Sequence, residues 1–468
     1  MNDTKRNGDD LIQPDRGQDA IDIHLVDKDG FEAWLKTLSG PQRAAIEAQR
    51  FKGAAGETAI VQDGANESRG WFAAAGVARP DRLTSWCLAP LAGRLPAGTY
   101  RLAKGDAARA MLGWQCAQYR FDRYRSEAEE TGDRVLLSKE VKAIDASLAE
   151  GRATFMVRDL VNTPAEDMGP SAIEAEAEAL AKAHGAKINV TKGDRLEGEF
   201  PLVHAVGRAA SRHHAPRMIE LNWGSDKHPL VSLVGKGVCF DSGGLDIKSS
   251  KGMLLMKKDM GGAAHVLALA GLVMGAGLKV RLQLLVPTVE NAIAGNAFRP
   301  GDIVKSRKGL SVEIGNTDAE GRLILADALT LASEGKPDLV IDYATLTGAA
   351  RVALGPDLPA LFARKEDTAR EFIEGGKSVD DEVWQLPLHG AYAEYLKSDV
   401  ADLGNVGGNG FAGASIAGLF LDRFVGEGID WAHFDTYAWR PSAKPGRPKG
   451  GEALGLRAAW AMLQKRYS

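Results

Sequence analysis

The segment LVSLVGKGVCFDSGGLDIK, residues 230–248, joins a short apolar run to a loop rich in glycine and charged residues. The run 230–234 has the length and apolarity of a strand that is buried on both faces. After Pro170, similar runs alternate with helical patterns. This alternation predicts an α/β fold whose mixed, mostly parallel sheet is sandwiched by helices. Ligands in such sheets bind beyond the carboxyl ends of the strands, where the charged loop is expected to lie.

The spacing of apolar residues predicts the elements of this larger domain. Helices are expected at 171–184, 262–274 and 454–466. Strands are expected at 201–206, 218–223, 230–234, 280–287 and 339–344. Residues 442–451 are expected to form a loop before the final helix.

A chain of 468 residues exceeds the usual size of a single core, so more than one domain is expected. We expect a polar, mobile tail at 1–20, a small N-terminal α/β domain at 21–135, a linking helix at 136–163 and a larger domain at 164–468. The helix ends before Pro164, since proline disfavours helix at the residue before it. It could join two domains or lie wholly within one, and Gly151 is where it could break.

The composition argues against several classes of protein. Lys plus Arg total 58 and Asp plus Glu total 62, so a net charge of −4 disfavours a protein that grips nucleic acid electrostatically. Cys87, Cys116 and Cys239 form no CxxC pair, so neither a disulfide framework nor a thiolate zinc site is expected. There is no HExxH motif, and His265 is expected to be a packed helix residue. Without a signal segment or a bilayer-length apolar run, we expect a cytoplasmic protein without membrane contact.

Two lysines and two aspartates follow the buried strand: Lys236, Asp241, Lys248 and Asp259. Glycines flank them, which suits tight turns that aim side chains at one point. Any one of them could be a solvated loop residue, but so many charges directly after a core strand favour a functional site. The lysine in GKG is not followed by the Ser or Thr that a P-loop requires, so a nucleotide site is not expected.

A second charged segment, NTDAEGRL at 316–323, precedes an Ala/Leu-rich helix. Asp318, Glu320 and Arg322 could be a surface ion-pair group. Combined with the first cluster, however, they bring together four carboxylates, which cannot all stay ionised in a partly buried site without cations. Oxygen ligands suit Mg²⁺, Mn²⁺ or Zn²⁺, and bridging carboxylates can hold two such ions about 3.5–4 Å apart.

GKGVCFDSGG followed by DIK, KKDMGG at 257–262 and NTDAEGRL resemble the signature motifs of the leucyl (cytosol) aminopeptidases, a family of two-metal exopeptidases. Supporting segments lie at 162–170, 290–304, 342–350 and 398–405. The resemblance covers about residue 136 to the end and implies a catalytic metallopeptidase domain at 164–468. The first 130 residues carry no motif that we recognise.

The resemblance implies a role for each charged residue. Two divalent ions, Mn²⁺ or Zn²⁺, would be bound by Lys236, Asp241, Asp259, Asp318 and Glu320. Asp241 and Glu320 would bridge the ions, and adjacent cations would have to lower the pKa of Lys236, because a metal-bound lysine is neutral. Lys248 would stabilise the oxyanion, and Arg322 would hold a bicarbonate ion as general base.

The resemblance also implies the substrate and the assembly. An apolar pocket for the first residue of a short peptide would be lined by Met256, Asn316, Thr345 and Leu346. The enzyme would release Leu and other apolar residues by attack of a metal-activated water. Family members are usually homohexamers, so a homohexamer is expected.

Two other functions remain open at this point. The carboxylates alone would permit another two-metal hydrolase, such as a phosphoesterase, although the lysine ligand and NTDAEGRL do not fit one. DNA binding, which some family members also perform, would need basic surfaces. The basic stretches 208–217 and 444–449 are expected to be solvated loops.

Overall fold

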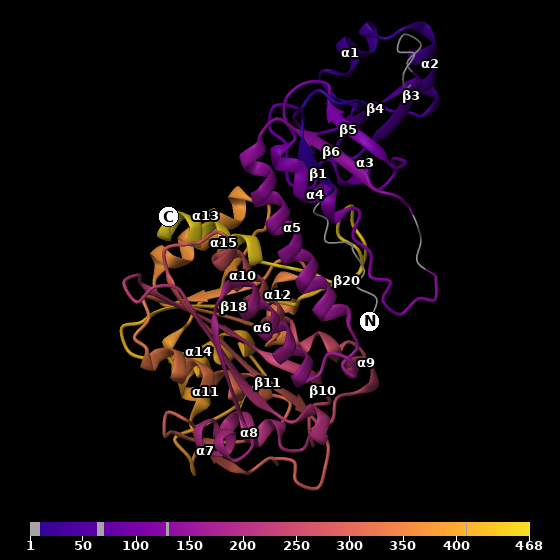
Figure 1. The fold of residues 1–468 in the computed structure, drawn as a ribbon. Coiled ribbons are helices and arrows are strands. Elements are labelled where there is room, and N and C mark those ends of the chain that lie inside the picture. Colours follow the sequence, from indigo (N-terminus) through magenta and orange to yellow (C-terminus); the bar gives the residue numbers. More distant parts are fainter. Residues whose placement is uncertain (1–9, 63–69, 128–130, 409) are drawn as a thin grey trace. The chain divides into compact units, whose positions relative to one another are not determined.

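The computed structural model describes residues 10–62, 70–127, 131–408 and 410–468 (Figure 1). The chain divides into two compact units. The smaller comprises Met1–Phe155 with Ser442–Lys449, and the larger comprises Met156–Pro441 with Gly450–Ser468. The domain boundaries that we placed at residues 21, 136 and 164 remain predictions.

The smaller unit is built on a six-stranded sheet with the order β1-β6-β5-β2-β4-β3. Neighbouring strands are parallel except for β3 and β4, which are antiparallel. The strands are β1 (Ile12–Pro14), β2 (Ile21–Val26), β3 (Thr58–Gln62), β4 (Trp71–Gly76), β5 (Gly98–Leu102) and β6 (Arg134–Ser138). The helices are α1 (Phe31–Thr37), α2 (Gly40–Ala48), α3 (Ala89–Ala92), the 3-10 helix η1 (Ala108–Ala110) and α4 (Met111–Cys116). This arrangement confirms a small α/β domain.

The prediction of a polar tail at 1–20 is wrong for part of that range. Strand β1 pairs in parallel with β6, and Ile12 is 2% exposed because it packs into the core of the smaller unit. Two apolar residues, Leu11 and Ile12, suffice for this because the partner strand is already in place. Residues 1–9 of the predicted tail lie outside the described residues.

The long helix begins later than the sequence suggests. Residues Arg134–Ser138 form β6, between β1 and β5, and helix α5 spans Val141–Asn162. The helix is continuous through Gly151. A Cβ atom at this position would lie 2.4 Å from Oε1 of Gln115, so close packing explains the glycine without a break.

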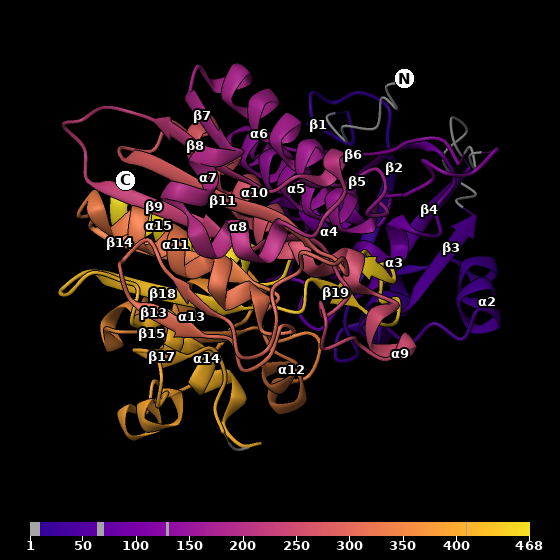
Figure 2. The same ribbon diagram turned by 90° about the horizontal axis from the view of Figure 1, so that it is seen from below.

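The larger unit contains a nine-stranded sheet with the order β16-β15-β18-β14-β9-β11-β8-β7, and β10 also pairs with β11. Figure 2 shows the strands following one another in this order from β7 to β15. The central strands β18, β14, β9 and β11 run parallel, whereas β15, β8 and β7 introduce antiparallel pairs. The strands are β7 (Lys187–Lys192), β8 (Arg217–Trp223), β9 (Leu230–Gly235), β10 (Gly237–Asp241), β11 (Arg281–Asn291), β14 (Leu339–Ala344), β15 (Ala360–Ala363), β16 (Trp384–Gln385) and β18 (Asp430–Asp435).

Helices cover both faces of this sheet, as the sequence predicts (Figure 1). One layer contains α6 (Pro170–His184), α10 (Gly261–Gly275), α13 (Glu366–Ser378) and α15 (Leu456–Tyr467). The other contains α8 (Pro201–Gly207), α11 (Glu320–Glu334) and α14 (Gly413–Asp422). The remaining elements are α7 (Asp194–Glu199), η2 (Arg212–His214), α9 (Ser250–Met253), η3 (Met256–Met260), β12 (Ile303–Lys305), β13 (Ser311–Glu313), α12 (Gly348–Leu354), η4 (Gly390–Leu396), β17 (Leu403–Gly404), β19 (Trp439–Arg440) and β20 (Gly450–Gly451).

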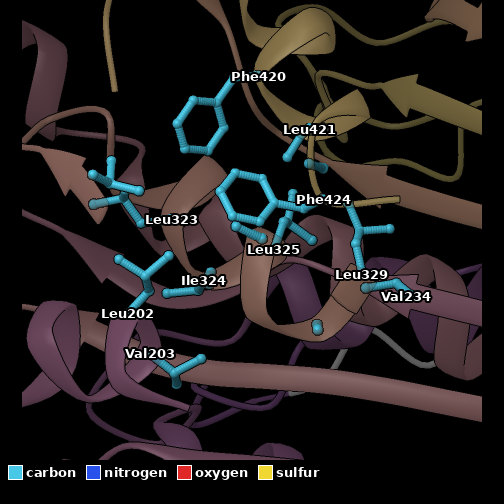
Figure 3. Packing of buried hydrophobic residues seen from close by; sticks show 14 of the residues in the cluster. Leu202, Val203, Val234, Leu323, Ile324, Leu325, Leu329, Phe420, Leu421 and Phe424 are labelled. Atoms are coloured by element: carbon cyan, nitrogen blue, oxygen red, sulfur yellow. The ribbon is translucent and has the colours of Figure 1, made fainter. Parts of the chain in front are cut away.

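The strand predicted at 201–206 is wrong, because this segment is helix α8. Its apolar run fits either a buried strand or a short buried helix, and Pro201 at the first helical turn favours the helix. Figure 3 shows Leu202 and Val203 of α8 packed in one core with residues of α11 and α14, including Leu323 and Phe420. The other strands and helices that we predicted in this unit are present within a few residues of the expected bounds.

His265 is a packed helix residue, as predicted. Its ring is fully buried in α10, with Nδ1 2.7 Å from the carbonyl oxygen of Gly261. Its Nε2 accepts a hydrogen bond of 3.0 Å from the backbone N–H of Leu454. Among the described residues, no helix combines the length and apolarity that crossing a bilayer requires.

The start of α8 depends on a carboxylate from another helix. The fully buried Asp327 of α11 accepts backbone hydrogen bonds from Leu202 and Val203, at 2.8 and 3.3 Å, and from Arg307 at 2.8 Å. Phe200 at the N-cap of α8 cannot satisfy these donors with its own side chain. Asp327 therefore holds together the start of α8, the segment around Arg307 and helix α11, which are far apart in sequence.

Replacing Asp327 with Ala should lower the free energy of unfolding by about 2–4 kcal/mol, because three buried N–H groups lose their acceptor. Urea unfolding followed by circular dichroism would measure this change. The control is Asp367→Ala, at an exposed carboxylate that forms an ion pair with the exposed Arg370 at 3.0 Å. An equal effect of the two substitutions would contradict the capping role of Asp327.

Candidate metal centre

The charged residues predicted to form a site meet at the carboxyl ends of the parallel strands. Lys236 directly follows β9, Asp241 ends β10 and Thr345 directly follows β14. Asp259 lies in η3 just before α10, and Glu320 is the first residue of α11. This is the edge of the sheet at which α/β proteins place ligands.

Lys236 occupies an interruption between two strands. Strand β9 pairs with β11 up to Val234, and β10 resumes the pairing at Gly237. The backbone N–H of Lys236 donates instead to the carbonyl of Tyr343, at 3.0 Å, and its carbonyl accepts from Ala263, at 2.8 Å. The side chain is thereby turned into the sheet edge, where it is only 3% exposed.

Three carboxylates surround this lysine. Asp241, Asp259 and Glu320 are buried, and one oxygen of each lies within 4.8 Å of an oxygen of the others. Nζ of Lys236 lies 2.7 Å from Oδ2 of Asp259 and 2.9 Å from Oε1 of Glu320. Its ammonium also donates to the backbone carbonyl of Thr345, at 3.1 Å.

A second lysine covers the open side of the cluster. Nζ of Lys248 lies 2.8 Å from Oδ2 of Asp241 and forms an ion pair with Asp318. The Lys248 and Asp318 side chains are 16% and 34% exposed, in contrast to the buried trio. The predicted site therefore has a closed side at Lys236 and an open side at Lys248.

The charge of the cluster is not balanced by its lysines. Four carboxylates face three ammonium groups, those of Lys236, Lys248 and Lys258, which leaves 4 − 3 = 1 negative charge in excess. Oε2 of Glu320 is buried and accepts no hydrogen bond from the described residues. A buried carboxylate oxygen without a donor fits a cation, so the donor set suits hard divalent metal ions.

The pKa values record the same imbalance. Burial, reinforced by neighbouring carboxylates, raises the pKa of Asp241 to about 6 and that of Glu320 to about 8. Burial opposes the charge of Lys236, but the carboxylates of Asp259, Glu320 and Asp241 outweigh it and raise the pKa of this lysine. The cluster thus favours any species that adds positive charge.

An arginine lies beside the cluster. Arg322 is 9% exposed, and its Nη1 donates to the carbonyl oxygen of Asn405 at 2.8 Å. Burial lowers the pKa of Arg322 to about 10, against the opposing effect of Glu320. Its Nε is buried and donates to no described residue, so the guanidinium keeps a free donor for an anion.

The residues expected to line a substrate pocket lie around the same cluster. Thr345 Oγ1 donates to Oδ1 of Asp259 at 2.7 Å, and Asn316 Oδ1 accepts from the backbone of Asp318 at 2.7 Å. Leu346 follows Thr345 and is half-buried, and Met256 begins η3, three residues before Asp259. All eleven predicted site residues therefore fall within segments that converge on one sheet edge.

Sequence reasoning assigned no role to the residues that hold these segments together. Asn291, the last residue of β11, donates from Nδ2 to Oδ1 of Asp241 at 2.9 Å and to the carbonyl of Thr317 at 3.1 Å. Asn405 accepts from Gly315 at 2.8 Å and donates to the carbonyl of Asn316 at 2.7 Å. Both residues lie in segments that support the resemblance. An uncharged amide that binds backbone groups gives no charge pattern in the sequence, so its role could not be predicted.

Glycines allow the close approach of these segments. Gly243 and Gly244 adopt φ values of +88° and +65°, which only glycine tolerates without strain. At Gly321, a Cβ atom would lie 2.5 Å from Cε of Lys236. The glycines of the motifs are thus needed for the turn after β10 and for the packing of Lys236 against α11.

The sequence motifs assign no role to one further lysine that is buried beside the cluster. Lys258 is 6% exposed, and its Nζ lies 3.9 Å from Oδ1 of Asp259 and 5.1 Å from the centre of the Tyr437 ring. Burial lowers the pKa of Lys258 to about 8, and the charge of Asp259 opposes this shift. The amine is therefore protonated in most molecules at neutral pH.

Comparison with known proteins gives the following matches. The profile described as "Cytosol aminopeptidase family, catalytic domain" matches residues 155–459, and "M17 aminopeptidase, N-terminal domain" matches residues 21–137. A probable cytosol aminopeptidase of Syntrophotalea carbinolica is 40% identical over 367 residues, which are 75% of this chain and 73% of the relative.

Two solved structures share the whole fold. The cytosol aminopeptidase of Coxiella burnetii is 45% identical, with a TM-score of 0.91 over 98% of this chain and 100% of that one. The bottromycin maturation enzyme BotP in complex with Mn is 32% identical, with a TM-score of 0.84 over 96% of this chain and 99% of that one. The N-terminal match shows that the family resemblance extends to residues 21–137, a region in which we recognised no motif.

Replacing Asn291 with Ala should weaken Mn²⁺ binding about 10- to 100-fold, because Asp241 loses the group that orients it. Calorimetric titration of the purified chain would give the affinity. Asn222→Ala is the control, since the side-chain amide of this exposed residue of β8 donates to Glu220 at 3.1 Å, away from the charged cluster. Unchanged Mn²⁺ affinity in the Asn291 variant would show that the amide is not needed to position Asp241.

Proposed function

Because the chain belongs to the cytosol aminopeptidase family, whose members are metal-dependent exopeptidases, we propose that the cluster around Lys236 is the catalytic centre of an aminopeptidase. The observation that carries this proposal is the convergence of four carboxylates around a buried lysine, with more carboxylates than ammonium groups in the cluster. The reaction is the release of N-terminal residues from short peptides.

Five residues would hold two divalent ions, Mn²⁺ or Zn²⁺. They are Lys236, Asp241, Asp259, Asp318 and Glu320. Bound ions would supply an acidified water and Lewis-acid polarisation of the scissile carbonyl. The buried oxygen Oε2 of Glu320, which has no hydrogen-bond donor among the described residues, and the mutual repulsion of Asp241, Asp259 and Glu320 support this assignment. Binding of cations would favour the neutral form of Lys236, which a lysine ligand requires.

Lys248 would act on the substrate carbonyl. Its ammonium lies on the open side of the cluster, held between Asp241 and Asp318. A peptide that enters there would bring its scissile carbonyl to this cation, which would stabilise the negative oxygen of the tetrahedral intermediate.

Arg322 would hold a bicarbonate ion, which supplies the general base. The buried guanidinium supports this role, because its Nε has no acceptor among the described residues and its charge favours an anion. No carboxylate is left over to take the proton of the attacking water, since all four are assigned to the metals.

The first residue of the peptide would occupy the space between η3 and the segment after β14, against Met256, Asn316, Thr345 and Leu346. The resemblance gives a preference for Leu and other apolar residues. A homohexameric assembly and a cytoplasmic location are the remaining parts of the proposal, and both rest on the family alone.

The competing functions have less support. A phosphoesterase does not explain a lysine within a carboxylate cluster. DNA binding would draw on the stretches 208–217 and 444–449, but Arg217 is buried in an ion pair with Glu174 and Arg447 lies 4.5 Å over the ring of Trp86. These contacts favour structural roles for the basic residues.

Metal removal should abolish activity. We expect the chain to hydrolyse leucine p-nitroanilide with Mn²⁺ or Zn²⁺, to lose the activity on exhaustive chelation, and to regain it when metal is restored. A generic phosphate ester serves as the comparison substrate. Faster hydrolysis of that ester would favour the phosphoesterase, and chelation-resistant peptide hydrolysis would contradict a metal mechanism.

Lys248→Ala should lower kcat for leucine p-nitroanilide about 100- to 1000-fold, since the developing oxyanion loses its charged donor. Asp318→Asn should also lose most of the turnover. The matched control is Lys251→Ala, at an exposed lysine of α9 three residues further along the chain. Wild-type rates in the Lys248 variant would remove this residue from the mechanism.

A further inference from the structure

Lys258 is a buried ammonium whose charge the proposed chemistry does not use. Its side chain is 7% exposed, and within the described chain it donates no hydrogen bond. Its nearest carboxylate oxygen, Oδ1 of Asp259, lies 3.9 Å away, beyond hydrogen-bond distance. Three N–H donors in such a place require a reason, because burying donors without hydrogen-bond acceptors is costly.

Asp259 does not provide that reason. Its Oδ2 lies 2.7 Å from Nζ of Lys236, and its Oδ1 accepts a hydrogen bond of 2.7 Å from Thr345. Both oxygens are therefore engaged by other groups. Lys258 adds positive charge beside a carboxylate that already has its partners.

The surroundings of Lys258 are positive and aromatic. Its Nζ lies 5.1 Å from the centre of the Tyr437 ring, and the guanidinium carbon of Arg351 lies 4.9 Å from the same ring. Arg351 is exposed. Tyr437 is half-buried, so two cations share one aromatic side chain. The acidic groups that act on Lys258 are Asp259 and Asp435.

These groups belong to the same wall as the proposed pocket. The segment that carries Tyr437 runs beside the segment after β14, since Asp435 accepts from the backbone of Leu346 at 3.0 Å and Thr436 donates to the carbonyl of Ala344 at 2.9 Å. A Cβ atom on Gly261 would touch both Ala438 and Thr345, at 2.5 and 3.0 Å. Lys258 of η3 therefore lies near Arg351 of α12 and near Tyr437, which follows β18.

From this arrangement we propose that Lys258 is a specificity-determining residue that lets the enzyme accept acidic N-terminal residues, glutamate above all. The proposal rests on the proposed function, because it places the first side chain of the peptide against η3 and Thr345. A carboxylate there would receive charge-assisted hydrogen bonds from a lysine that has none. Arg351 and Tyr437 would complete the recognition.

The wild-type enzyme provides the first test. The values of kcat/KM for the p-nitroanilides of glutamate, methionine and leucine are compared with Mn²⁺ present. Methionine has nearly the length of glutamate without its charge. We expect the glutamate substrate to be cleaved at least as well as the methionine substrate, and a deficit of about 100-fold or more would overturn the proposal.

Variants then test whether Lys258 is the residue that recognises the acidic side chain. Lys258→Met and Lys258→Gln should each lower the ratio of kcat/KM for glutamate to that for leucine by about ten-fold or more. The matched control is Lys257→Met, at the neighbouring lysine whose Nζ instead donates to the carbonyl of Asn162 at 2.5 Å. This control should leave the ratio unchanged.

The outcomes separate two failures. If both Lys258 variants lose glutamate and leucine hydrolysis equally, the lysine acts through Asp259 and the specificity role is wrong. The specificity role is also wrong if the ratio of kcat/KM for glutamate to that for leucine does not change. If the wild-type chain hydrolyses none of the three substrates with metal, the proposed function fails and the inference falls with it. Melting temperatures of the variants show whether they are folded, and the wild-type comparison needs no variant.

Discussion

The burial of Lys236 among three carboxylates is the interaction on which the site depends. A lysine in this position has no route to water, so its charge must be met by Asp259 and Glu320 or removed. The carboxylates in turn cannot share so small a space without cations. The fold therefore creates a region in which protons, ammonium groups and metal ions compete for the same oxygens.

The concentrated charges are held in place by backbone and amide contacts around them. The interruption between β9 and β10 turns Lys236 inward, and the positive φ of Gly243 and Gly244 returns the chain toward the cluster. Asn291 then fixes Asp241 through a neutral amide. Because each device is a backbone or amide contact, the ionisable groups remain available for ligands and substrate.

Much of this could be predicted from the sequence because apolar runs and charged motifs carry strong signals. The strands β9 and β14 and the helix α10 were predicted in that way, and the eleven proposed site residues lie in segments that the structure brings to one sheet edge. Segment 201–207 misled us because an apolar run of seven residues fits a strand or a helix, and Asp327, which caps it, lies more than a hundred residues away. Strand β1 was missed because three residues give no periodicity, and Asn291 and Asn405 because amides that bind backbone leave no pattern. Lys258 lies within a recognised motif, yet only its burial and lack of partners reveal it.

The central claim is that the carboxylate excess around Lys236 is matched by two divalent ions. Metal content per chain, measured by plasma mass spectrometry after reconstitution with Mn²⁺ and removal of free metal, tests it most directly. The account predicts two ions per wild-type chain and fewer than two in Glu320→Gln, which loses one charge and the unpartnered oxygen. A wild-type chain that retains no metal, or a Glu320→Gln chain that retains two ions, would contradict it.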